Sequence, residues 1–144
     1  MTMDLDATGT YPAEQPSIPT ILLVDDNPAI LEWISRALSR HGYDVLIAPN
    51  GSMALTLAAH CAKRVRLLLT DVEMPGMDGV VLARKFCTEF PETRIMFMSG
   101  AVQPAAIEGS SFLCKPFTLR ALLDAVKELL AQNGSRAQKL AAAE

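Results

Sequence analysis

The sequence lacks the features by which several classes of protein are recognised. It has no run of basic residues, since the first arginine is Arg36 and the first lysine is Lys63, and its formal net charge is −3. A surface that binds nucleic acid needs clustered Lys and Arg. No apolar run approaches the roughly 20 residues that span a membrane, and the N-terminal segment has neither the basic residues nor the apolar stretch of a signal peptide. We therefore expect a cytoplasmic protein that binds neither nucleic acid nor membrane directly.

Cysteine is also scarce. Cys61, Cys87 and Cys114 stand singly, with no CxxC spacing. Isolated free cysteines usually pack as small apolar residues, and we expect that role for all three rather than a disulfide or a metal site. This usage is typical of a reducing compartment.

The length and composition suit one globular domain, with half of the 144 residues apolar. Residues 1–19 contain three prolines and no hydrophobic period, so we expect a disordered leader. Residues 20–132 should form the domain. Gly134 and Ser135 interrupt the last helical pattern, and we interpret residues 133–144 as a C-terminal tail.

Short apolar runs alternate with amphipathic stretches between these flanks. The runs are uniformly apolar, as strands buried on both faces must be, and cover residues 21–24, 45–48, 67–69, 95–98 and 112–114. Helical periodicity is present over residues 28–41, 52–62, 79–89 and 119–130. Because crossovers between parallel strands are almost always right-handed, the alternation predicts an α/β fold with a parallel sheet and helices on both faces.

Residues that can carry chemistry come directly after these runs. Asp25 and Asp26 follow the first run, Asp71 the third, Ser99 the fourth and Lys115 the fifth. In such sheets, ligands bind at the carboxyl ends of the strands. Three neighbouring carboxylates cannot all stay ionised without a cation, and hard oxygen ligands favour Mg²⁺. A carboxylate nucleophile, a Mg²⁺ site and a lysine together indicate phosphoryl transfer.

Four segments carry a resemblance to a known family. They are ILLVDDNPAI (21–30), LLLTDVEMPGMDG (67–79), MFMSG (96–100) and FLCKPF (112–117). In this order, and each at the end of an expected strand, they resemble the receiver domains of two-component response regulators over residues 20–131. The resemblance implies a doubly wound, five-stranded parallel sheet of the flavodoxin-like or CheY-like type. The segment from Lys115 to Leu130 is similar to receivers of the hybrid histidine kinase type.

The resemblance implies a role for each acidic residue. Asp71 matches the aspartate that accepts a phosphoryl group from a phosphohistidine on a sensor histidine kinase or a histidine phosphotransfer domain. Asp26 matches the carboxylate that binds Mg²⁺ directly, and Asp25 matches the neighbouring carboxylate, which usually reaches the metal through water. Glu73 matches the position whose backbone carbonyl ligates the metal.

Three further positions match residues that respond to the phosphoryl group. Ser99 matches the hydroxyl residue that hydrogen-bonds a phosphoryl oxygen, and Lys115 the lysine that pairs with it. The bond from Lys115 to Pro116 is typically cis in the family. Phe112 stands at the aromatic switch position, although a plain core role fits it at least as well.

Simpler structural roles are possible for several of these residues and for others outside the site. Asp25 and Asp26 can serve as helix caps, but Asn27 followed by Pro28 already supplies a cap. Ser99 precedes a glycine, which is a common turn dipeptide. Asp78 is interpreted as the cap of the third helix. Trp33 and Phe86 are interpreted as packing residues, and His41 and His60 as contacts at helix ends.

One segment departs from the family. Only sixteen steps separate Ser99 from Lys115, about six fewer than the family has, or roughly one and a half helical turns. We therefore expect a shortened or missing fourth helix, with at most one turn at residues 104–108, and hypothesise that dimerisation through the usual output face is weakened or altered.

The function expected from these residues is a phosphoacceptor module, not a free-standing enzyme, which changes conformation to signal to an output partner that the sequence does not name. The chain is either a stand-alone receiver or part of a longer protein. A degenerate receiver acting as a phosphorylation-independent docking module is the main alternative. A small aspartate-dependent phosphatase is a further one, although the cap and second carboxylate of such enzymes are not evident.

Overall fold

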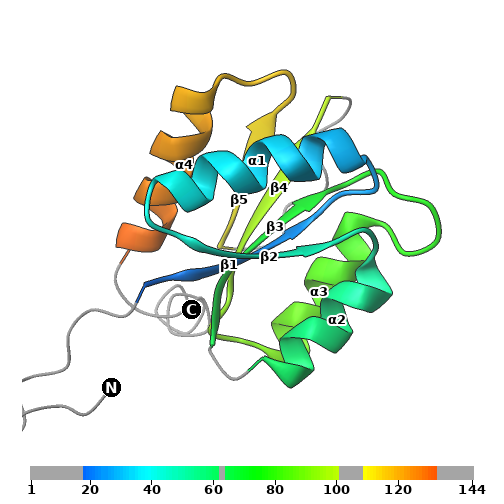
Figure 1. Cartoon of the computed structure of the whole chain (residues 1–144). Coiled ribbons are helices and arrows are strands. Elements are labelled where there is room, and N and C mark those ends of the chain that lie inside the picture. Colours follow the sequence, from blue (N-terminus) through cyan, green and yellow to red (C-terminus); the bar gives the residue numbers. More distant parts are fainter. Residues whose placement is uncertain (1–17, 62–63, 101–108, 133–144) are drawn as a thin grey trace, which may run out of the picture.

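The computed structural model describes residues 18–61, 64–100 and 109–132. Within them the chain forms one five-stranded sheet and two layers of helices (Figure 1). The strands are β1 (Thr20–Val24), β2 (Asp44–Ala48), β3 (Val65–Asp71), β4 (Arg94–Ser99) and β5 (Ser110–Cys114). The helices are α1 (Pro28–Arg40), α2 (Gly51–His60), α3 (Gly79–Glu89) and α4 (Leu119–Ala131).

All neighbouring strands are parallel, in the order β2-β1-β3-β4-β5. This is the flavodoxin-like order, in which the strand sequence reverses between β1 and β3. The prediction of a doubly wound, five-stranded parallel sheet is confirmed. The expected shortening of the fourth helix falls on residues 101–108, which lie outside the described residues, and it stays a prediction. The same holds for the expected leader and tail outside residues 18–132.

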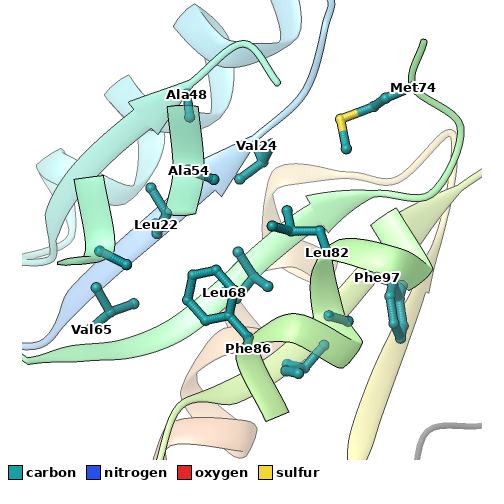
Figure 2. Packing of buried hydrophobic residues seen from close by; sticks show 13 residues of the cluster. Leu22, Val24, Ala48, Ala54, Val65, Leu68, Met74, Leu82, Phe86 and Phe97 are labelled. Atoms are coloured by element: carbon teal, nitrogen blue, oxygen red, sulfur yellow. The ribbon is translucent and has the colours of Figure 1, made fainter. Parts of the chain in front are cut away.

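The helices cover both faces of the sheet because successive strand residues point to opposite sides. On one face, Leu22, Val24 and Leu68 pack against α2 and α3 (Figure 2). Leu82 and Phe86 of α3 are fully buried there. On the other face, alternate residues of the same strands pack against α1 and α4; the cluster includes Ile21, Leu23, Leu67, Leu69, Ile34, Leu38, Leu122 and Val126. This double burial explains why the strands are uniformly apolar in sequence.

Side-chain caps set where the helices begin, as predicted. Asn27 accepts a hydrogen bond from the Ala29 amide, and Asp78 accepts one from the Val81 amide at 2.8 Å. Thr118 caps α4 in the same way. Each cap satisfies an amide that has no partner inside the helix. The carboxylate of Asp78 is therefore engaged in capping, as the sequence indicated.

Helix α2 is shorter than predicted. Cys61 already has an extended backbone, so the helix ends at His60 and not at residue 62. The imidazole Nδ1 of His60 lies 2.8 Å from the Thr56 carbonyl oxygen, and that of His41 lies 2.9 Å from the Ala37 carbonyl oxygen. These histidines contact the ends of their own helices, as expected.

The packing predictions hold only in part. Cys61 and Cys87 are half-buried, but Cys114 is exposed because it ends β5, the edge strand of the sheet. Phe86 is fully buried, whereas Trp33 is 43% exposed on α1. In the described part of the chain, no helix has the length and apolar character needed to cross a membrane.

Candidate functional site

The three acidic residues singled out from the sequence lie together where β1 and β3 end. These strands are neighbours in the middle of the sheet, with Val24 opposite Thr70 in the register, and the loops that follow them leave the same end of the sheet (Figure 1). Asp25, Asp26 and Asp71 each place a carboxylate oxygen within 4.8 Å of the other two. Asp25 and Asp71 are buried, and Asp26 is exposed. The topology thus brings carboxylates from distant parts of the sequence into one cluster, which is exposed to solvent on the side of Asp26.

Lys115 supplies a positive charge to this cluster. Its Nζ lies 3.1 Å from Asp25 Oδ2 and 3.4 Å from Asp71 Oδ1. Its backbone amide donates to the Ser99 carbonyl oxygen at 2.9 Å, which extends the pairing of β5 with β4 by one residue. Since β4 lies next to β3, this pairing places the lysine at the same end of the sheet as Asp71.

Two hydrogen bonds fix the orientation of Asp25. Its Oδ1 accepts from the Asn27 amide at 2.9 Å, while its Oδ2 faces Lys115. The side chain is only 1% exposed. A buried carboxylate with a partner on each oxygen has little freedom to rotate, so Asp25 is the rigid member of the cluster.

The backbone around Asp71 is held from three sides. The Thr70 hydroxyl donates to the Asp71 carbonyl oxygen at 2.9 Å, and the Val72 amide donates to the Met98 carbonyl oxygen at 3.0 Å. The Gly79 amide donates to the Val72 carbonyl oxygen at 2.8 Å. A Cβ at Gly79 would lie 2.9 Å from the Val72 Cα and closer still to the Asp71 carbonyl oxygen, so only glycine fits there.

The sequence reasoning did not identify the role of Gly79. The signal was present in the dipeptide of Asp78 and Gly79, which combines a helix cap with a residue that has no side chain. It indicates that the start of α3 packs directly against the end of β3, and that close approach fixes the loop carrying Asp71.

The other predicted site residues occupy different surroundings. Ser99 is 1% exposed at the end of β4, one strand from Asp71. Glu73 is exposed on the loop after β3. Phe112 is half-buried on β5 and packs against the core between the sheet and the pair α2 and α3, which agrees with the plain packing role. The peptide bond from Lys115 to Pro116 is cis, as the resemblance implied.

The charges of the cluster shift the pKa values of two members. Burial, together with the neighbouring Asp25 carboxylate, raises the pKa of Asp71, and Lys115 opposes this only in part. For Lys115, burial alone would lower the pKa, but hydrogen bonds and charge interactions with Asp25 and Asp71 outweigh it and raise the pKa. The ammonium is thus held in its charged form while Asp71 ionises less readily than a free aspartate.

The donor set fits a hard divalent cation. Three carboxylates share a space with one ammonium, which leaves negative charge in excess. The donors are carboxylate oxygens, which Mg²⁺ prefers, and the exposed Asp26 leaves one side open to the waters that Mg²⁺ usually retains. An acidic cluster at the carboxyl end of a flavodoxin-like sheet, with a lysine beside it, defines the class of receiver-like α/β domains.

Comparison with known proteins agrees with this class. The model of the family described as "Response regulator receiver domain" matches residues 21–127. The chain is 37% identical over 117 residues to the sensor kinase CckA of Brucella abortus, which covers 77% of this chain and 12% of CckA. It is 35% identical over 116 residues to the response regulator receiver protein CpdR of the same organism, covering 76% of this chain and 95% of CpdR.

The solved structures extend the likeness to three dimensions. The crystal structure of the receiver domain from the hybrid histidine kinase CckA superimposes with a TM-score of 0.69 at 37% identity, over 77% of this chain and 98% of that one. The chain belongs to the family of response regulator receiver domains. Its likeness to CckA agrees with the hybrid kinase type indicated by the sequence. The receiver proteins it resembles are signalling modules.

Proposed function

We propose that this receiver is a phosphorylation switch in which Asp71 accepts a phosphoryl group from a phosphohistidine of a sensor histidine kinase or a histidine phosphotransfer domain, in a cytoplasmic setting. The observation that carries the proposal is the cluster itself. Asp71 lies within 4.8 Å of two further carboxylates and 3.4 Å from the Lys115 ammonium. A nucleophilic carboxylate beside acidic metal ligands and a fixed cation is the combination that phosphoryl transfer to oxygen requires.

The reaction moves one phosphoryl group between two side chains. An Asp71 carboxylate oxygen forms a bond to phosphorus as the P–N bond of the phosphohistidine breaks. The electron pair of the broken bond stays on the imidazole nitrogen, and the product is an acyl phosphate on Asp71. Lys115 pairs with the new phosphoryl oxygens, and the buried Ser99 hydroxyl donates a hydrogen bond to one of them.

Residues on the first and third strand ends would hold Mg²⁺. They are the carboxylates of Asp25, Asp26 and Asp71 and the backbone carbonyl of Glu73. When bound, the ion supplies positive charge that offsets the phosphoryl oxygens and the acidic cluster. Asp25 is already oriented by the Asn27 amide and Asp26 faces solvent, so one ligand is rigid and another is accessible from outside.

The signal is a change of shape and not a released product. The phosphoryl group adds negative charge and strong acceptor oxygens at Asp71. Movement of Ser99 and Lys115 toward it biases a bistable surface that an output protein reads, with Phe112 on β5 as the aromatic that turns inward when Ser99 moves.

Intact-mass measurement with acetyl phosphate tests the proposal. Wild type with Mg²⁺ should gain the mass of one phosphoryl group, and the gain should disappear with a chelator, with hydroxylamine treatment, or in Asp71→Asn. Asp78→Asn is the matched control, since it removes a carboxylate from the same loop while asparagine keeps the cap. No gain by wild type under any condition would make the phosphorylation-independent docking module the better function.

A further inference from the structure

Trp33, the one tryptophan of the chain, joins α1 to the segment between β5 and α4. It projects from α1 and is 43% exposed, so the core does not account for it. Its ring contacts the ring of Phe117, with centroids 5.8 Å apart and the planes inclined by 32°. Aromatic pairs at this separation attract each other beyond the area they bury.

The partner ring belongs to the segment that carries Lys115. One end of this segment is fixed by the Lys115 amide, which donates to the Ser99 carbonyl oxygen at 2.9 Å. The other end is fixed where Thr118 caps α4. Between these points Phe117 packs against the core cluster formed by α1, α4 and the sheet. Trp33 adds the contact that holds this stretch to α1.

The position of this segment decides where the lysine ammonium lies. Lys115 has a long, flexible stem, yet its Nζ must stay near both Asp25 and Asp71, at 3.1 Å and 3.4 Å. Asp25 is itself oriented by the amide of Asn27, the cap of α1. The beginning of α1 therefore holds one partner of the ion pair, and Trp33, further along α1, holds the segment that bears the other.

We infer that Trp33 is a positioning residue for phosphoryl transfer. Its contact with Phe117 keeps the Lys115 segment against α1, so that the ammonium lies at Asp71 when the phosphoryl group arrives. This inference rests on the proposed function of Asp71. The simpler alternative is that the exposed tryptophan serves only to contact a partner protein. The inference differs from it because Trp33 should then affect the reaction rate of the isolated domain, with no partner present.

The test measures the rate of phosphorylation by acetyl phosphate at saturating Mg²⁺, a donor too small to need a protein-docking surface. Trp33→Ala and Trp33→Leu should slow the reaction about threefold to tenfold, where a factor of ten corresponds to about 1.4 kcal/mol. Trp33→Phe should keep the rate within about twofold of wild type, because a ring remains to contact Phe117. Arg36→Ala, an exposed change one turn further along the same helix, should leave the rate unchanged.

A double-mutant cycle separates positioning from a general loss of structure. In a Lys115→Met background the further change Trp33→Ala should have no effect on the rate, because Trp33 acts through the lysine. Wild-type rates in both Trp33→Ala and Trp33→Leu would overturn the inference, as would the same loss with and without Lys115. Slower transfer only from a histidine-phosphorylated protein would assign Trp33 to docking instead. If wild type accepts no phosphoryl group, the proposed function fails, and the inference falls with it.

Discussion

Replacement of Asp71 by asparagine should stabilise the metal-free domain and should reduce the stabilisation that Mg²⁺ gives. Asparagine keeps the shape of the side chain and removes its charge. In the metal-free domain the negative charge lowers the stability of the folded state, because Asp71 is buried beside Asp25. The same burial raises the pKa of Asp71. In the Mg²⁺-bound domain the same carboxylate is a ligand of the metal.

The charge interactions of Asp71 nearly cancel. At an effective dielectric constant of about 20, repulsion from Asp25 within 4.8 Å is at least about 3.5 kcal/mol, and attraction to Lys115 at 3.4 Å is about 5 kcal/mol. The exposed Asp26 adds screened repulsion. Removing a carboxylate from water costs several kcal/mol, so this penalty decides the sign. We expect Asp71→Asn to be more stable than wild type by about 1 to 2 kcal/mol in chelator.

Urea unfolding at pH 7, in chelator and in Mg²⁺, measures this difference. At a hundred times its dissociation constant, Mg²⁺ should stabilise wild type by about 2.7 kcal/mol, and Asp71→Asn less at the same concentration because a ligand is gone. Asp124→Asn, an exposed change on α4, should stay within about 0.5 kcal/mol of wild type in both conditions. If Asp71→Asn is less stable than wild type in chelator, the ion pair with Lys115 outweighs burial and the reasoning is wrong.

The pH dependence of the metal-free domain has a definite sign. Because the pKa of Asp71 is higher in the folded chain than in the unfolded one, the folded state holds the proton more tightly. The stability that this protonation contributes to wild type is therefore fully present below the unfolded-state pKa. It is lost as the pH rises through the folded-state pKa. Relative to Asp71→Asn, wild type should lose stability over this range in chelator.

Three further predictions follow from the contacts of the site. Gly79→Ala should lower the free energy of unfolding by about 1 to 3 kcal/mol, because the added Cβ meets the backbone of residues 71 and 72; Gly100→Ala, whose Cβ would have only ordinary contacts at 3.6 Å, is the matched control in the same urea titration. Lys115→Met should slow phosphorylation by acetyl phosphate at least about tenfold, because one charge-assisted pair is lost from the transition state; an unchanged rate would remove Lys115 from the mechanism. Asp26→Asn should weaken Mg²⁺ binding, measured by calorimetry, while stability in chelator stays within about 0.5 kcal/mol; equal Mg²⁺ affinities would contradict its role as a ligand.

The sequence predicted the sheet well because both faces of each strand are buried, which leaves an apolar run that is easy to recognise. It underestimated the length of all five strands, and that of β3 the most. β3 runs from Val65 to Asp71 and so includes the polar Arg66 and Thr70 on either side of the predicted run, and β4 begins at Arg94, which is only 6% exposed. Polar residues inside a buried strand interrupt the hydrophobic signal, although the backbone pairing continues through them.

The gathering of the acidic residues could be predicted from the rule that ligands bind at the carboxyl ends of parallel strands. The pairing of Lys115 with both Asp25 and Asp71 could not, because the reach of a flexible side chain depends on the packing of its segment. The exposure of Trp33 and its contact with Phe117 were missed for the same reason. An aromatic residue among helical apolar positions is usually a core residue, and only the fold shows which neighbour it has.

Locating the acyl phosphate shows whether Asp71 is the phosphoacceptor. After reaction with acetyl phosphate and Mg²⁺, borohydride reduction converts a phosphorylated aspartate to homoserine, and peptide mass spectrometry locates the change. We expect homoserine at residue 71 in wild type, and unmodified peptides when Mg²⁺ is chelated. Homoserine at Asp25 or Asp26, or no conversion in a domain that is folded and saturated with Mg²⁺, would contradict it.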